Sequence, residues 1–266
     1  MGDTYTHGHH ESVLRSHRWR TAENSAGYLL PFLAPGLRLL DVGCGPGTIT
    51  LDLAARVAPG QTVGVDRDAG VVADAQRLLD SRRVAGVQFR TADAYALGVD
   101  DGSFDVVHAH QVLQHLTDPV AALVEMRRVL RPGGVLAVRD SDYGAFVWAP
   151  PNPLLDRWMQ LYHDVCRHNG ADADAGRCLL GWAQKAGFTD IRPSSSTWTF
   201  AEPESRQWWG ELWADRVVSS SLAEQAVDYG FSSRDELKAI AAAWRQWLAQ
   251  DDGFFVVVHA ELIARR

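Results

Sequence analysis

The 266-residue sequence predicts an α/β fold, in which a mostly parallel sheet carries helices on both faces. Two observations support this prediction. Short runs rich in β-branched residues alternate with longer runs of helical periodicity, and Gly43, Gly45 and Gly47 form a turn inside the first strand–helix pair. Such an alternation needs crossover connections, which place parallel strands side by side with helices above and below them.

The first half of the chain supplies five of the expected strands, at residues 37–43, 62–66, 87–93, 104–110 and 135–141. The helices expected between them are residues 48–58, 69–84 and 118–134. Pro132 and the two glycines after it end the last helix, because proline and glycine interrupt helical backbone. A further helix is expected at 16–33, ahead of the first strand.

The composition changes after Ser141, and nine of the ten tryptophans lie beyond residue 147. The helices expected there are 154–169, 176–188, 203–227 and 233–250, and the strands are 189–200 and 253–266. Trp209 and Trp213 are four residues apart and share a helix face. Packing against the sheet and an aromatic lid over a substrate pocket are both open interpretations of these tryptophans.

Composition and charge narrow the class of protein. Apolar residues make up 46% and charged residues 22%, and the net charge of -7 offers no basic surface for nucleic acid. No apolar run reaches the roughly 20 residues of a membrane span, and no secretory signal is recognisable. Cys44, Cys166 and Cys178 show no metal-binding spacing. A soluble cytoplasmic protein is expected, with the question of a homodimer left open.

The glycine turn predicts a ligand site. Glycine lacks a Cβ, so the backbone at Gly43, Gly45 and Gly47 can approach a ligand closely, and the helix from Thr48 directs free N–H groups at it. Ligands of parallel sheets bind at the carboxyl ends of the strands, where this turn lies. The third glycine comes one residue earlier than in the dinucleotide pattern G-x-G-x-x-G, which argues against a dinucleotide.

The stretch Asp41-Val-Gly-Cys-Gly-Pro-Gly47 resembles motif I of class I S-adenosylmethionine (SAM) dependent methyltransferases. Asp66 at the end of the second strand and Asp93-Ala94 after the third match further landmarks of that family. "FDVVHAHQVLQHL" (104–116) and "RVLRPGGVLAVRD" (128–140) are similar to its fourth strand with the following helix and to the entry of its fifth strand. The resemblance covers residues 37–141 and is nearest to the ubiquinone/menaquinone-type small-molecule enzymes.

The resemblance implies a Rossmann-like seven-stranded sheet whose last strand is antiparallel and lies beside the fifth. It implies one domain, with a core at 34–141, an N-terminal cap at 1–33 and lid helices at about 142–188 and 203–250. It also implies SAM as cofactor and S-adenosylhomocysteine as product. Asp66 would bind the ribose hydroxyls and Asp93 the adenine amino group. The other implied cofactor contacts are Trp19, Asp41, Gly43, Cys44, Gly45, Gly47, Arg67, Val71, Ala92, Ala94, Ala109, His110 and Gln111.

Methyl transfer of this kind is an in-line displacement, and it needs a general base only where the acceptor oxygen, nitrogen or carbon retains its proton. His110 and His115 are the catalytic candidates, and His115 is expected to share a helix face with Gln111. His108 points the other way along its strand and is expected to be structural. The acceptor is expected to be a small organic molecule contacted by His17, Arg20, Asp140, Tyr143, Trp209 and Trp213.

No metal is expected. Asp140 and Asp142 lack a third partner, and His7, His9 and His10 lack carboxylate or cysteine partners at the chain terminus. An NAD(P)-dependent oxidoreductase would need the other glycine spacing and a Tyr/Lys pair, whereas the chain has only Lys185 and Lys238. A protein of this fold that binds SAM without methyl transfer, as a regulator or a cyclase-like enzyme, would show the same cofactor residues and stays open.

Overall fold

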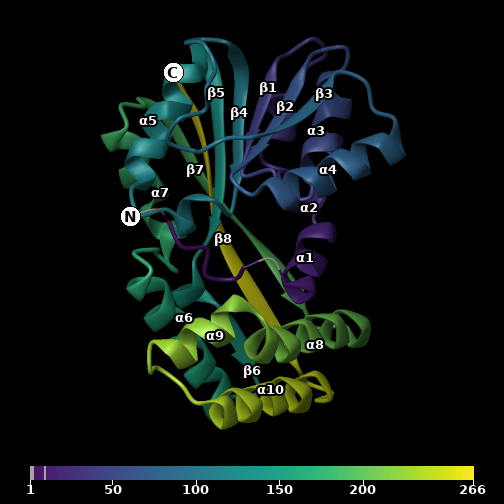
Figure 1. The fold of residues 1–266 in the computed structure, drawn as a ribbon, viewed down its shortest axis with the longest axis vertical. Coiled ribbons are helices and arrows are strands. Elements are labelled where there is room, and N and C mark those ends of the chain that lie inside the picture. The colour runs from purple at the N-terminus through teal and green to yellow at the C-terminus, as the bar shows by residue number, and fades with distance from the viewer. Residues whose placement is uncertain (1–2, 9) are drawn as a thin grey trace.

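The computed structural model describes residues 3–8 and 10–266, and within them eight strands form one sheet (Figure 1). The sheet order is β3-β2-β1-β4-β5-β8-β6, and β7 also pairs with β8. The strands are β1 (Leu39–Val42), β2 (Thr62–Asp66), β3 (Val87–Thr91), β4 (Phe104–His110), β5 (Leu130–Ser141), β6 (Val147–Ala149), β7 (Asp190–Phe200) and β8 (Phe254–Arg265).

The predicted fold class is confirmed. The first five strands run parallel, and β8, the last strand, lies antiparallel beside β5. The sheet has one strand more than the seven expected, because β6 adds a pairing of Val147–Ala149 with β8. A strand of three residues is too short to show an alternating pattern in the sequence.

Helices cover both faces of the sheet because successive strand residues point to opposite sides. Leu39 of β1 packs in the core with α2 (Ala22–Ser25) and α3 (Thr48–Val57), whereas Leu40 packs in the core with α5 (Pro119–Val129) and α7 (Ala175–Lys185). The helix α4 (Ala69–Arg82) lies against β2 and β3. Figure 1 shows α3 and α4 on one side of the sheet and α5 and α7 on the other.

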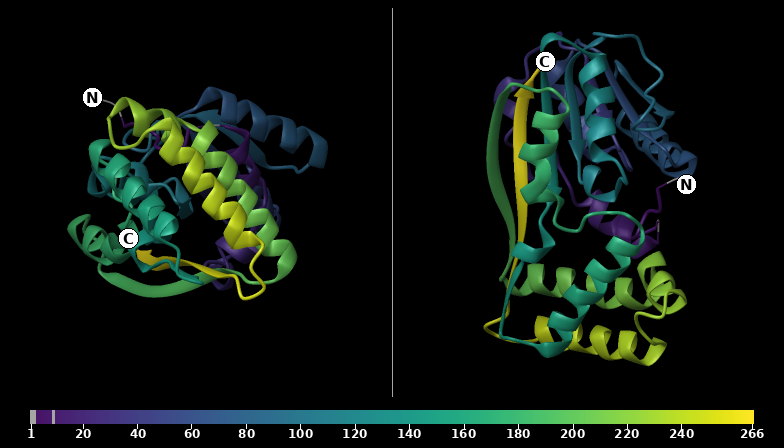
Figure 2. Two further views of the ribbon diagram at one scale, coloured as in Figure 1. Left: turned by 90° about the horizontal axis from the view of Figure 1, so that it is seen from below. Right: turned by 90° about the vertical axis from the view of Figure 1, so that its left-hand side faces the viewer.

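Four further helices gather beyond the carboxyl ends of the parallel strands, and we call them the lid: α6 (Pro153–His168), α8 (Pro203–Ser219), α9 (Ser221–Asp228) and α10 (Arg234–Leu248). The long strands β7 and β8 reach from the sheet toward these helices, and α8 and α10 lie side by side (Figure 2). Within the expected lid range 142–188, only α6 joins this group, because α7 packs on the sheet.

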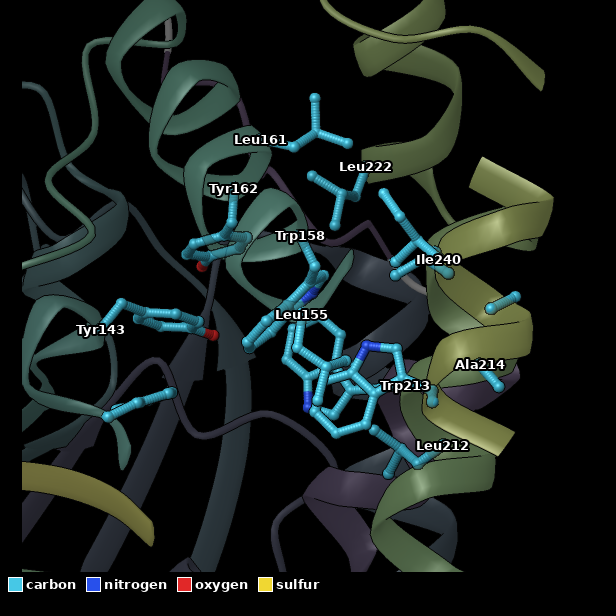
Figure 3. Packing of buried hydrophobic residues seen from close by; sticks show 14 of the residues in the cluster. Tyr143, Leu155, Trp158, Leu161, Tyr162, Leu212, Trp213, Ala214, Leu222 and Ile240 are labelled. Carbon is cyan, nitrogen blue, oxygen red and sulfur yellow. The ribbon is translucent and has the colours of Figure 1, made fainter. Parts of the chain in front are cut away.

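The tryptophans of the lid pack mainly against one another. The ring centroids of Trp158 and Trp213 are 4.6 Å apart, those of Trp158 and Trp244 are 5.0 Å apart, and all three side chains are buried. Figure 3 shows Trp158 and Trp213 meeting between α6 and α8, with Tyr143 and Tyr162 beside them. The lid therefore has a largely aromatic core, which includes the adjacent ends of β7 and β8 and is separate from the two cores on the sheet.

Two expected helices are divided in the structure. The range 203–227 becomes α8 and α9, because Ser220 has an extended backbone and its hydroxyl donates to the Arg216 carbonyl. The expected helix 16–33 is wrong: α1 (Glu11–Arg18) ends early, α2 follows, and Leu30–Phe32 is a 3₁₀ turn. Thr21 and Asn24 form a capping box that starts a new helix, and Pro31 is the second residue of the 3₁₀ turn.

Candidate active site

A cavity of about 450 Å³ lies between the carboxyl ends of the parallel strands and the lid, a size suited to a small ligand. We name two groups of its lining residues. The glycine wall consists of residues 41–46, Thr48 and Ile49. The aromatic wall consists of Tyr143, Phe146, Trp198, Trp208, Trp209 and Trp213.

The glycine turn has the geometry that its sequence requires. Gly43, Gly45 and Gly47 have φ angles of +69°, +53° and +82°, which residues with a Cβ rarely adopt. A Cβ on Gly43 would lie 2.3 Å from a methyl of Val112, so the turn can approach the segment that follows β4 only with glycine there. No side chain of residues 3–8 or 10–266 caps the start of α3, so its first N–H groups are available to a ligand. Gly47 corrects one expectation, because it packs toward Phe89 and does not line the cavity.

Asp41, the first residue of the glycine wall, holds the wall in place through hydrogen bonds to neighbouring elements. Its carboxylate lies 2.7 Å from His108 Nδ1 and accepts a 2.5 Å hydrogen bond from the Thr50 hydroxyl, so it ties β1 to β4 and α3. Asp41 lines the cavity but is only 2% exposed. His108 is fully buried and does not line the cavity, as expected of a structural residue.

The acidic residues at the ends of β2 and β3 line the same cavity. Asp66 accepts hydrogen bonds from the backbone N–H groups of Gly45 and Asp68, each at 3.1 Å. Asp93 accepts from the Tyr95 N–H at 3.0 Å. The remaining expected contacts here also line the cavity: Cys44, Arg67, Val71, Ala92 and Ala94. Ala109 corrects another expectation, because its side chain is buried in the core shared with α5 and does not reach the cavity.

His110 lies at the end of β4 and lines the cavity. It is 6% exposed, and neither ring nitrogen has a hydrogen-bond partner among residues 3–8 and 10–266. Burial, aided by the positive charges of Arg20 and Arg139, holds the pKa of His110 well below its ordinary value. The imidazole is therefore neutral at pH 7 and free to bond to a ligand.

The proton of His115 can be placed from its neighbours. Gln114 Oε1 accepts from the Ser141 N–H at 3.1 Å, so its Nε2 is the atom that donates to His115 Nε2, also at 3.1 Å. His115 Nδ1 must then carry the ring proton, and it has no partner among the described residues. Burial lowers the pKa of His115 to about 3, so this residue offers a neutral N–H donor.

Gln111 lines the cavity, but it does not share a helix with His115 as expected. Its φ is +54°, and only Leu113–His115 forms a 3₁₀ turn. Its Oε1 accepts from Arg20 at 2.6 Å, and its Nε2 lies 2.9 Å from His259 Nε2. Arg139 Nη2 lies 3.0 Å from the other ring nitrogen of His259. Because Arg139 donates to one nitrogen of the neutral His259 ring, the other nitrogen carries the proton and is itself a donor. The Gln111 amide therefore faces two donors, His259 and Arg20, and its single oxygen can accept from only one of them.

The N-terminal segment closes over the cavity, crossing between the sheet and the lid in Figure 1. His17, Trp19 and Arg20 line the cavity as expected, and residues 3–8 add Asp3, Tyr5 and His7. His7 is 5% exposed, and its Nε2 lies 3.0 Å from the Tyr162 hydroxyl. These three residues lie in the expected N-terminal cap, but none of them was expected to contact the cofactor or the acceptor. His10 caps α1, and His9 lies outside the described residues.

Of the expected acceptor contacts, Tyr143, Trp209 and Trp213 line the cavity and Asp140 does not. Asp140 is fully buried and accepts from the Gln114 N–H at 3.1 Å, and burial raises its pKa to about 8. Sequence reasoning missed Arg216, which lines the cavity from α8. Its position three residues after Trp213 was the available signal, because that spacing shares a helix face.

Across the described parts of the chain, no group of three or more His, Cys, Asp or Glu side chains is placed to hold a metal ion. None of the described helices is long and apolar enough to cross a membrane.

Residues 33–193 match the family model described as "Methyltransferase domain". An uncharacterized methyltransferase of Schizosaccharomyces pombe is 34% identical, over 98% of this chain and 96% of its own length. The chain belongs to the class I SAM-dependent methyltransferases. Its cofactor is therefore SAM, as the motif I resemblance implied, and nothing supports the oxidoreductase alternative.

Other similar proteins differ in activity. An O-methyltransferase of Penicillium expansum is 31% identical, over 75% of this chain and 71% of that protein. The solved structure of the [4+2]-cyclase SpnF is 25% identical with a TM-score of 0.54, over 100% of this chain and 89% of that one. Phosphoethanolamine N-methyltransferase 2 of Haemonchus contortus, solved with S-adenosylhomocysteine, shares the fold at 20% identity and a TM-score of 0.57, over 91% of this chain and 52% of that one.

Proposed function

We propose that this methyltransferase transfers a methyl group to a hydroxyl oxygen of a small organic acceptor held between the glycine wall and the aromatic wall. The observation that carries the proposal is His110, a buried neutral imidazole with both nitrogens unpartnered among the described residues, on a cavity that also holds the family's cofactor residues. The similarity to O-methyltransferases supports oxygen as the nucleophile.

The glycine wall fits the cofactor. The uncapped start of α3 and the close backbone at Gly43 suit a polar ligand, and Asp66 suits ribose hydroxyls as a charged acceptor. Asp93 would take the adenine amino group. Arg20 would bind the carboxylate of SAM. It donates a hydrogen bond to Gln111, and the next residue, Val112, lies against Gly43 of the glycine wall. When bound, SAM supplies a methyl group on a sulfonium sulfur, which leaves as the neutral thioether of S-adenosylhomocysteine.

His110 acts as the base in this proposal. Its neutral ring accepts the proton of the acceptor hydroxyl as that oxygen gains the methyl group. His115 holds its proton on Nδ1, so it orients the acceptor or cofactor by donating a hydrogen bond and does not serve as the base. The lid and residues 3–8 exclude water, which keeps these contacts strong.

Calorimetric titration with SAM, S-adenosylhomocysteine and NADH tests the cofactor, and we expect binding of the first two only. Incubation with methyl-labelled SAM and a panel of phenols, carboxylic acids and amines tests the reaction, and we expect label in the phenols. His110→Gln should lower the rate about 100- to 10,000-fold without changing SAM affinity. His163→Gln is the matched control, because His163 pairs with Asp174 away from the cavity.

The alternative without methyl transfer has one observation in its favour, the full-length similarity to a [4+2]-cyclase. The same incubation separates the two functions. A protein that binds SAM but labels no member of the panel, and that converts unsaturated substrates with S-adenosylhomocysteine in place of SAM, would contradict our proposal.

A further inference from the structure

Arg216 is a buried cation on the cavity wall that no carboxylate balances among the residues the structure describes. It is 4% exposed. Its Nη2 donates to the Ser12 carbonyl at 3.0 Å and to the Ser16 hydroxyl at 2.9 Å, and both of these acceptors are neutral. Its Nε has no partner in the described part of the chain. Burying a charge without a counterion is costly, so this arrangement favours an anionic ligand.

The groups around Arg216 do not supply that anion. Tyr5 stays protonated because burial raises its pKa to about 12, and burial likewise raises the pKa of Tyr143. His7 is neutral, because burial lowers its pKa. The carboxylates that line the cavity come from other elements and accept hydrogen bonds from backbone or side-chain groups there: Asp3, Asp41, Asp66, Asp68 and Asp93.

Arg216 belongs to the aromatic side of the cavity. Its guanidinium lies 4.7 Å from the ring centroid of Trp213, a member of the aromatic wall. Arg20 bonds to Gln111 beside the glycine wall, and its guanidinium also lies 5.7 Å from the ring centroid of Trp198 on the aromatic wall. Arg20 therefore lies where the two walls meet, whereas Arg216 stacks on the aromatic wall, so Arg216 is the arginine placed to meet an anion on a ligand that packs there.

We infer that the acceptor is an aromatic hydroxy acid whose carboxylate pairs with Arg216 while its ring packs on the aromatic wall. This inference rests on the proposed function, because it deepens the description of the acceptor at the same site. The carboxylate is a handle for recognition and the hydroxyl is methylated, so the product is an ether that still carries a free acid.

The test compares acids with their uncharged counterparts. Hydroxybenzoates and hydroxynaphthoates, each paired with its methyl ester, are titrated into the complex with S-adenosylhomocysteine. At least one acid should bind about 10- to 100-fold more tightly than its ester, as a charge-assisted hydrogen bond provides. If no acid in the panel binds more tightly than its ester, the inference is overturned. Failure of S-adenosylhomocysteine itself to bind would instead contradict the proposed function.

Three variants locate the effect. Arg216→Met should abolish the preference for the acid, and Arg216→Lys should retain part of it. Arg245→Met is the matched control, because Arg245 pairs with Glu211 and Asp215 away from the cavity, and it should leave the preference unchanged. S-adenosylhomocysteine should bind all three variants normally. If Arg216→Met weakens its binding as much as that of the acid, Arg216 binds the cofactor and the inference is wrong.

Discussion

The glycine wall and the aromatic wall face one cavity, yet they are built in different ways. The glycine wall comes from one continuous stretch, residues 41–49, in which Gly43 and Gly45 leave the backbone open to a ligand. The aromatic wall is assembled from side chains of the neighbouring elements β7 and α8 and of the loop after β5, which lies well before them in the chain. Backbone recognition leaves a short readable motif, whereas a wall of side chains has none. The difference explains why the cofactor could be inferred before the structure and the acceptor could not.

The largest effect should come from the lid core. Trp158→Ala should cost about 3–5 kcal/mol of the free energy of unfolding, as measured by urea denaturation, because Trp158 is buried against Trp213 and Trp244 of the lid and Phe255 of β8. Trp19→Ala is the control: Trp19 lines the cavity but is 37% exposed, so it should cost much less stability. Equal costs would mean that the lid has no core of its own.

The next effect tests the glycine wall. Asp66→Asn should weaken SAM binding by about 1–3 kcal/mol in calorimetry, because the amide loses the charge that strengthens bonds to ribose hydroxyls. Asp93→Asn should weaken it less, because an amide oxygen still accepts from an adenine amino group. Unchanged affinity of the Asp66 variant would show that the ribose binds elsewhere.

Buried titratable groups between the two walls predict a pH dependence. The folded pKa of His115 is about 3, below its ordinary 6.5, so the unfolded chain binds one proton more between these values. Stability from this histidine is therefore complete above pH 6.5 and falls as the pH falls. His115→Gln should therefore reduce the fall of the free energy of unfolding with falling pH, by as much as about 1.4 kcal/mol per pH unit in a series of denaturation measurements.

Asp140 provides a control of opposite sign. Its folded pKa is about 8, above its ordinary 3.8, so here the folded state holds the extra proton. Asp140→Asn should make the free energy of unfolding fall more steeply as the pH drops from 6.5 to 4. The change in slope should be on the order of the change expected for His115→Gln. If His115→Gln and Asp140→Asn change the slope of the free energy of unfolding against pH in the same direction, these effects of burial on the two pKa values are contradicted.

The smallest effect concerns residues 3–8, the N-terminal segment that lines the cavity. The Asp3 carboxylate accepts from the N–H and the hydroxyl of Thr117, at 2.9 and 2.7 Å. Asp3→Ala should cost about 1 kcal/mol or less of stability but speed the dissociation of S-adenosylhomocysteine in stopped-flow measurements. Asp80→Ala, at an exposed site on α4, should change neither. An unchanged dissociation rate would show that residues 3–8 do not restrain the product.

Much of the sheet half could be predicted from sequence, because strand cores and the glycine turn depend on local chemistry. The helix expected at 118–134 is too long, because α5 ends at Val129 and Pro132 with its two glycines belongs to β5. The bounds of β2 and β4 agree with expectation to the residue. Predictions failed where distant contacts decide. Ala109 and Asp140 lie beside cavity residues in sequence but point into the core, and local pattern does not fix which neighbour of a strand end faces a ligand. Arg216 and His7 enter the cavity only through the packing of α8 and of residues 3–8.

The clustering of indoles in the lid has a spectroscopic consequence. Residues 34–141 contain no tryptophan, whereas Trp158, Trp213 and Trp244 have ring centroids within 4.6 to 6.0 Å of one another. Asymmetric indole packing generates near-ultraviolet circular dichroism, which disappears when tertiary packing is lost. That band therefore belongs chiefly to the lid, while the far-ultraviolet signal reports on the whole chain. One thermal scan at two wavelengths can thus follow lid packing and backbone melting separately, without an added label.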